Sequence, residues 1–137
     1  MSIYDIEPGY EIPPVRQVTD AQQMKLMAAL LHDPNPTHFD VEAVNKLGLG
    51  ERPVTQGPMT VSYLADMLTT WAGGPQSLRS LRVRMLTNVF AGDTITCTGR
   101  VTDVDRVGGV IAVDVQAAVG DTPAVAGTAV VVVATNA

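Results

Sequence analysis

Two side chains that can exchange protons near neutral pH lie five positions apart in one proline-rich segment. Asp33 and His38 belong to the run Asp33-Pro34-Asn35-Pro36-Thr37-His38-Phe39-Asp40. Each proline fixes its own φ and restricts the residue before it, so the segment is suited to holding side chains in place. A carboxylate beside an imidazole can work as a general acid/base pair. The same residue types are common in turns, so a helix-ending turn without catalytic function is the alternative interpretation.

A glycine and a proline precede the longest apolar stripe at helical spacing. Pro58 follows Gly57, and proline is favoured at the first position of a helix. The stripe comprises Val61, Leu64, Ala65, Leu68 and Ala72, and a second apolar face comprises Met59, Tyr63 and Met67. This pattern predicts a buried helix over residues 58–72. Its N-terminus would favour negative charge, so the Gly57 amide could polarise a carbonyl oxygen, or Gly57-Pro58 could simply be a tight turn into the helix.

The remaining chain predicts two shorter helices and a run of strands. We expect residues 1–18 to be extended, and a helix over about residues 20–31 with Thr19 as its N-cap and Gln22 completing a capping box. Asp40 can cap a short helix through Leu47. Beyond Pro75 the apolar period becomes two, and the last run, residues 124–134, is apolar on both faces, as in a central strand. The order indicates an α+β fold in which a sheet wraps around a helix.

The proline-rich segment and the glycine that follows resemble the signature of the MaoC-like or hydratase 2 family, the (R)-specific enoyl-CoA hydratases. That signature reads D-x-N-P-x-H-x-D, with H-G-M later opening a long apolar helix. The first part is present here in residues 33–40, and the second stands as Gln56-Gly57-Pro58-Met59. The similarity extends from Pro8-Gly9 to the turn Ala91-Gly92-Asp93 and the strand after it, and so covers nearly the whole chain.

The resemblance implies a single hot-dog domain over residues 1–137 that pairs edge to edge as a dimer. It also implies that Asp33 and His38 bind and activate a catalytic water, and that the Gly57 amide faces the thioester oxygen. Asn35 matches the asparagine of the signature, and we give it an orienting or loop-bracing role beside the substrate. We therefore expect an acyl-CoA or acyl-carrier-protein thioester as the substrate.

Other candidate binding residues are less sharply defined. Gln56 replaces the histidine usual before the glycine; it can form hydrogen bonds to the substrate or the loop but cannot titrate. Ser62 could face the acyl chain or pack within the helix. Arg82 and Arg84, with Arg79, could bind the phosphates of coenzyme A or form a solvated strand face. His32 is interpreted as a cation at a helix C-terminus.

Composition limits the classes of partner and cofactor. The 137 residues carry a formal charge of −5 and a pI near 4.7, which argues against nucleic acid as the main partner. Two histidines and one cysteine lack the spacing of zinc ligands, and no phosphate-binding or dinucleotide glycine pattern occurs, so we expect no cofactor or metal. No signal sequence or membrane-spanning run is visible, so we expect a cytoplasmic protein.

Four functions remain open at this stage. The first is an (R)-specific enoyl-CoA hydratase, or the reverse 3-hydroxyacyl thioester dehydratase. The second is a subunit that needs a second hot-dog subunit as a heterodimer partner. The third is a non-catalytic module that binds acyl thioesters, and the fourth is a hot-dog thioesterase. The presence of both Asp33 and His38 favours catalysis, whereas Gln56 keeps the non-catalytic module open.

Overall fold

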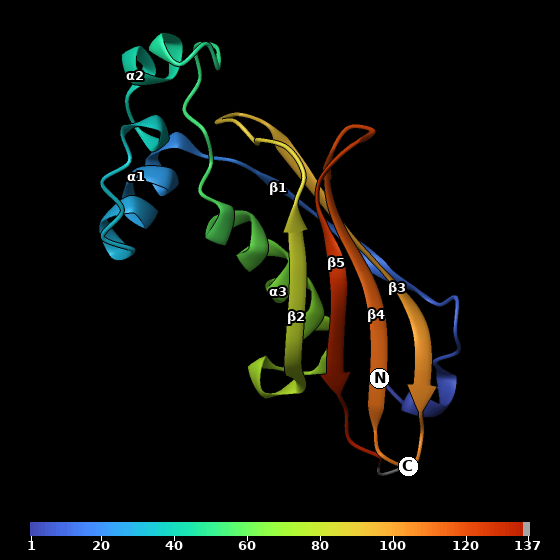
Figure 1. Ribbon diagram of the computed structural model, residues 1–137. Coiled ribbons are helices and arrows are strands. Elements are labelled where there is room, and N and C mark those ends of the chain that lie inside the picture. The colour runs from blue at the N-terminus through green and yellow to red at the C-terminus, as the bar shows by residue number, and fades with distance from the viewer. Residues whose placement is uncertain (136–137) are drawn as a thin grey trace.

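The computed structural model describes residues 1–135, and its framework is one antiparallel sheet of five strands in the order β1-β3-β4-β5-β2. The strands are β1 (Glu11–Val18), β2 (Leu78–Met85), β3 (Thr94–Asp105), β4 (Val110–Val119) and β5 (Thr122–Val132). Helix α3 (Gly57–Ala72) lies along one face of the sheet and contacts all five strands (Figure 1). The predicted α+β architecture, with a sheet wrapped around a buried helix, is confirmed.

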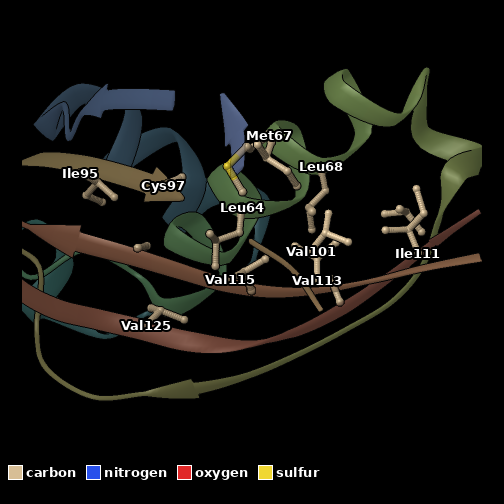
Figure 2. Packing of buried hydrophobic residues seen from close by; sticks show 14 of the residues in the cluster. Leu64, Met67, Leu68, Ile95, Cys97, Val101, Ile111, Val113, Val115 and Val125 are labelled. Atoms are coloured by element: carbon tan, nitrogen blue, oxygen red, sulfur yellow. The ribbon is translucent and has the colours of Figure 1, made fainter. Parts of the chain in front are cut away.

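The hydrophobic core lies between α3 and the concave face of the sheet. Leu64, Met67 and Leu68 of α3 point toward buried strand residues, among them Val101 and Val113 (Figure 2). Burying an aliphatic side chain of this size stabilises a fold by about 1.5–3 kcal/mol. The helix is apolar on two faces because the sheet curls around it, and this confirms its predicted burial.

The strand predicted to be central is interior. β5 pairs with β4 on one side and with β2 on the other, although it ends at Val132, before the end of the apolar run. β2 approaches so closely that a Cβ atom on Gly127 would overlap the Arg82 carbonyl oxygen. The apolar character of this run therefore reflects its interior position, and it does not indicate a sheet edge available to a partner.

The two edges of the sheet differ. β1, which the sequence indicated only as extended chain, pairs with β3, and its register shifts between Ile12 and Val15, where Pro13 and Pro14 lie. Proline cannot donate to a strand ladder, so this edge is poorly suited to further pairing. β2 forms the opposite edge and contains no proline.

The smaller helices lie at one end of the sheet (Figure 1). α1 (Ala21–Leu30) begins one residue later than predicted, because Asp20 and not Thr19 is its N-cap: the Asp20 carboxylate accepts the amides of Gln22 and Gln23. Thr19 is buried and donates its hydroxyl to the Asp93 carbonyl. α2 (Val41–Lys46) is capped by Asp40 as predicted. Three 3₁₀ turns complete the chain: η1 (Ile3–Asp5), η2 (Pro36–His38) and η3 (Pro75–Ser77).

Among residues 1–135, no helix combines the length and the apolar composition needed to cross a bilayer.

Candidate active site

The end of α1 directs the chain toward the carboxylate. His32 has a left-handed φ of 51°, in the αL region that only a few non-glycine residues adopt. The next amide, that of Asp33, returns to the Ala28 carbonyl at 2.9 Å. His32 therefore ends the helix and turns the chain, and its exposed side chain takes no part in the contacts described below.

Both oxygens of the Asp33 carboxylate are engaged within the proline-rich loop. Oδ1 accepts the amide of Asn35 at 3.0 Å, and Oδ2 lies 3.2 Å from Nε2 of His38. Asn35 in turn caps η2, where its Oδ1 accepts both the amide and the hydroxyl of Thr37. The two prolines and these local bonds hold the carboxylate against the imidazole, as the spacing predicted.

The proton on Nδ1 of His38 follows from the partner of that nitrogen. Nδ1 lies 2.6 Å from the carbonyl oxygen of Val54, which can only accept a hydrogen bond. Nδ1 therefore carries a proton, and Nε2 faces the carboxylate. A proton between Nε2 and Asp33 would make this contact a hydrogen bond, and the two groups could pass it from one to the other.

A short segment connects His38 to the beginning of α3. Val54 donates its amide to the Thr37 carbonyl at 2.8 Å, in addition to accepting from His38, and Thr55 donates its amide to Val89 at 2.7 Å. Two residues further on, α3 begins at Gly57. The histidine and the helix N-terminus are therefore fixed to the same stretch of backbone.

A pocket of about 390 Å³ contains both His38 and Gly57. Within residues 1–135 the Gly57 N–H has no hydrogen-bond acceptor, as expected for the first turn of a helix. Gly57 is not in the left-handed region, and a Cβ atom there would lie 3.2 Å from the terminal methyl group of Met85, the nearest atom. The other lining residues are Thr55, Thr60, Leu86, Thr87, Asn88, Val89 and Val125.

Asp33 lines a second hollow. This hollow of about 520 Å³ is shallow and largely apolar, and Lys25, Ala28, His32, Pro34 and Phe39 also line it. Asp33 and His38 therefore line different concave regions, and of these only the region of His38 also contains the helix N-terminus.

Two of the predicted binding residues, Gln56 and Ser62, donate side-chain hydrogen bonds to backbone carbonyl groups of the protein. Gln56 is 1% exposed, and its Nε2 donates to the Met24 carbonyl at 2.8 Å. Ser62 donates its hydroxyl to the Met59 carbonyl at 2.6 Å, within α3. Neither residue lines the pocket of His38 and Gly57, so the structure does not bring them together with the acid/base pair as substrate ligands.

The predicted arginines lie on the other face of the sheet. Leu81 and Val83 of β2 pack against the core, so Arg82 and Arg84, which alternate with them, face away from α3. Both are exposed and border a groove of about 480 Å³. Leu86, the residue after β2, lines both this groove and the pocket of His38 and Gly57, so the two lie next to each other at the end of that strand.

Sequence reasoning missed three residues of the site. Thr60 lies one turn after Gly57, and this helical spacing could have indicated that it shares the pocket. Asn88 reaches the pocket from the loop after β2, and the Val54 carbonyl orients His38. These two contacts join segments distant in sequence and carry no local signal.

Among residues 1–135, the pKa is clearly shifted for two side chains. Burial raises the pKa of the Cys97 thiol to about 11, and burial together with the charges of Cys97 and Asp20 raises the pKa of the Tyr63 hydroxyl. Cys97 lies in β3 against the core, outside the pocket. Within residues 1–135, no group of three or more His, Cys, Asp and Glu side chains is arranged to hold a metal ion.

Solved structures share this fold over almost the full length of the chain. The (R)-hydratase from A. caviae involved in PHA biosynthesis has a TM-score of 0.86 at 24% identity, covering 95% of this chain and 98% of its own. The (R)-hydratase PhaJ1 from Pseudomonas aeruginosa has a TM-score of 0.84 at 17% identity, covering 96% and 84%. The ChsH1–ChsH2 complex from Mycobacterium tuberculosis has a TM-score of 0.82 at 22% identity, covering 93% and 98%. These similarities confirm the predicted hot-dog fold.

Sequence comparison identifies the family. No curated protein matches the chain. The sequence model of the family described as "MaoC like domain" matches residues 5–121, which is most of the chain and includes the acid/base loop, α3 and most of the sheet. The chain therefore belongs to the MaoC-like family, as the resemblance of residues 33–40 and 56–59 predicted.

Proposed function

We propose that this protein is a hydro-lyase that adds water across the trans-2 double bond of an acyl thioester, or removes it in the reverse direction. The observation that carries the proposal is the 3.2 Å contact between Asp33 and His38, with His38 in the same pocket as the unpaired amide of Gly57. Hydration needs a base, an acid and an oxyanion donor, and these three residues supply one group for each need.

A proton shared between His38 and Asp33 would serve both proton transfers. A water held by the pair attacks the β-carbon while the Asp33 carboxylate accepts one of its protons. The protonated His38 gives its Nε2 proton to the α-carbon, so one water is added and no other reactant is needed. Transfer of the new proton from Asp33 to His38 then restores the starting state. Each acid or base contributes about 10²–10⁴-fold to the rate.

The Gly57 amide supports the charge that develops on the thioester oxygen. As water attacks, electrons move through the conjugated system toward that oxygen. An N–H group at the first turn of α3 is already oriented, and the helix dipole favours negative charge there. The terminal methyl group of Met85 lies beside this position and must leave room for the thioester.

The arginines of β2 are proposed to bind the phosphates of the carrier. Arg82 and Arg84 lie on the opposite face of the sheet from the pocket, so they cannot contact the reacting carbons. Leu86 lines both the groove that they border and the pocket, so a pantetheine arm bound in the groove would pass this residue to enter the pocket. Arginine suits phosphate because its guanidinium group donates two parallel hydrogen bonds.

A dimer that pairs through β2 is proposed as the assembled form. β1 is interrupted by Pro13 and Pro14, whereas β2 has an unpaired edge without proline. Light scattering at micromolar concentration is expected to give twice the chain mass of 14.5 kDa. A monomer under these conditions would contradict the dimer while leaving the catalytic proposal intact.

The experiment that tests the function is a spectrophotometric hydration assay with crotonyl-CoA and with a long or bulky enoyl-CoA. We expect loss of the enoyl absorbance and an (R)-3-hydroxyacyl product, in keeping with the (R)-hydratases that share the fold. A thiol reagent added in parallel would reveal free coenzyme A. Thiol release without hydration would favour a thioesterase and reject this proposal.

A partner-dependent subunit is the second candidate. It is favoured by the structural similarity to the ChsH1–ChsH2 complex, which contains two different chains. A purified chain that binds enoyl-CoA without converting it would favour this alternative, whereas turnover by the chain alone would exclude it.

A further inference from the structure

Gln56 is the N-cap residue of α3, and its side chain is also buried in the interior. Its backbone is the N-cap of α3, with φ −62° and ψ 136°, yet its side chain forms no capping bond to the helix. The side chain instead enters the interior, where it is 1% exposed and donates Nε2 to the Met24 carbonyl of α1. Its Oε1 has no hydrogen-bond partner among the described residues. Only the donor half of this buried amide is therefore used.

The bond from Gln56 joins the two halves of the proposed active site. On one side, Gln56 immediately precedes Gly57, whose amide is the proposed oxyanion donor. On the other side, Met24 belongs to α1, and the Asp33 amide, three residues beyond the end of that helix, returns to its Ala28 carbonyl. The one other side-chain link between these segments is a long contact of 3.7 Å between the Thr55 hydroxyl and the Met24 sulfur, within residues 1–135.

We propose that Gln56 is a positioning residue that fixes the distance between the Gly57 amide and the Asp33–His38 pair. His38 is tied to the same backbone segment through the Val54 carbonyl, so the histidine side of the site is already anchored. The Gln56 bond anchors the aspartate side. This inference rests on the proposed hydration, because it assigns a role within that chemistry.

The chemical requirement at this position is a donor that is neutral. The Met24 carbonyl can only accept a hydrogen bond, so a buried carboxylate in place of the amide would be repelled unless it were protonated. An apolar side chain of similar size would fill the space without forming the bond. These two changes therefore separate the hydrogen bond from the packing.

The test compares Gln56→Glu and Gln56→Met with a matched control, Ser77→Ala. Ser77 is also buried and also donates to a backbone carbonyl, that of Gly74, but it lies beyond the opposite end of α3. All four proteins are compared for kcat and KM on crotonyl-CoA well below their melting temperatures. Hydrogen exchange at the amides of Met59 and Thr60, both of which donate to the Gln56 carbonyl, is measured on the same proteins without substrate.

We expect Gln56→Met to lower kcat about tenfold to hundredfold with little change in KM, since a misplacement near 1 Å can cost about 10²-fold. Gln56→Glu should be equally impaired at neutral pH and should recover relative to wild type as pH falls, because the protonated carboxyl group can donate to Met24. Ser77→Ala should keep wild-type kinetics. In both Gln56 variants, exchange at Met59 and Thr60 should accelerate.

Native kcat in Gln56→Met, or a Gln56→Glu to wild-type ratio that does not change with pH, would overturn the positioning role. Unchanged exchange at Met59 and Thr60 would also overturn it, and this readout does not depend on the reaction. If wild type itself shows no hydration, the proposed function fails, while the exchange measurement still decides whether Gln56 anchors the start of α3.

Discussion

The sheet with α3 and the segment of residues 19–56 are held together by different forces. In the first region, apolar side chains of the helix and all five strands exclude water from one core. In the second, Leu26, Leu30 and Leu47 are 62%, 68% and 65% exposed. Side-chain caps stabilise the helical turns of this segment. The carboxylates of Asp20 and Asp40 cap α1 and α2, and the amide oxygen of Asn35 caps η2.

This difference separates stability from chemistry. Packing in the core contributes most of the folding free energy, so changes there should unfold the protein. The segment of residues 19–56 contributes less apolar burial, and it carries the proposed acid/base pair, Asp33 and His38, and the Gln56 side chain proposed to position Gly57. Changes that preserve its local hydrogen bonds should therefore remove activity with little effect on the melting temperature.

The largest expected effect is on the acid/base pair. Asp33→Asn keeps an oxygen to accept the Asn35 amide, and His38→Gln keeps a donor for the Val54 carbonyl, so the loop should stay folded. Each change should reduce kcat about 10²–10⁴-fold. Because both groups act on one water, the double variant should be little worse than either single one. Near-normal turnover of a single variant would show that its residue has another role.

The next effect concerns the oxyanion donor. Gly57→Val should cost about 10²–10³-fold in activity, and much more in activity than in melting temperature, because the side chain crowds the approach to the amide. Gly57 lies outside the left-handed region, so backbone strain does not confound the result. A companion variant, Gly57→Val with Met85→Ala, relieves the contact with the Met85 methyl group. Full recovery in that companion would place the fault in Met85 and not at the donor.

A change in the core should produce the opposite behaviour. Gly127→Ala forces a Cβ against the Arg82 carbonyl and separates β5 from β2, at a cost of about 3 kcal/mol. Thermal denaturation should show a melting temperature lower by roughly 10 °C, with activity per folded molecule retained. The neighbouring exposed change Thr128→Ala is the control and should melt like wild type. Equal melting of both variants would contradict the close strand approach.

The smallest effect concerns pH and the buried thiol. Burial raises the pKa of Cys97 from 9.0 to about 11, so the unfolded chain ionises first as pH rises. The free energy of unfolding should therefore be unaffected by this group below pH 9 and fall between pH 9 and about 11. Urea titrations of wild type and Cys97→Ala across this range measure the difference. If the free energy of unfolding changed with pH in the same way in both proteins, Cys97 would not contribute.

The sequence predicted elements well where the signal is local. The buried helix was recognisable from its apolar spacing, and the contact between Asp33 and His38 from their spacing in one loop. The N-cap of α1 was misassigned because Thr19 is taken by the distant Asp93 carbonyl, which leaves the cap to Asp20. The roles of Val54 and Asn88 depend on strand and loop contacts that no neighbouring residue encodes.

The most direct test of the central claim uses isotopically labelled water. Purified protein is incubated with crotonyl-CoA in this water, and the products of wild type and Asp33→Asn are compared by chiral separation and mass spectrometry. The account predicts that wild type places the labelled oxygen on the β-carbon of (R)-3-hydroxybutyryl-CoA, and that Asp33→Asn does so far more slowly. Label found in free crotonate, with coenzyme A released, would contradict it.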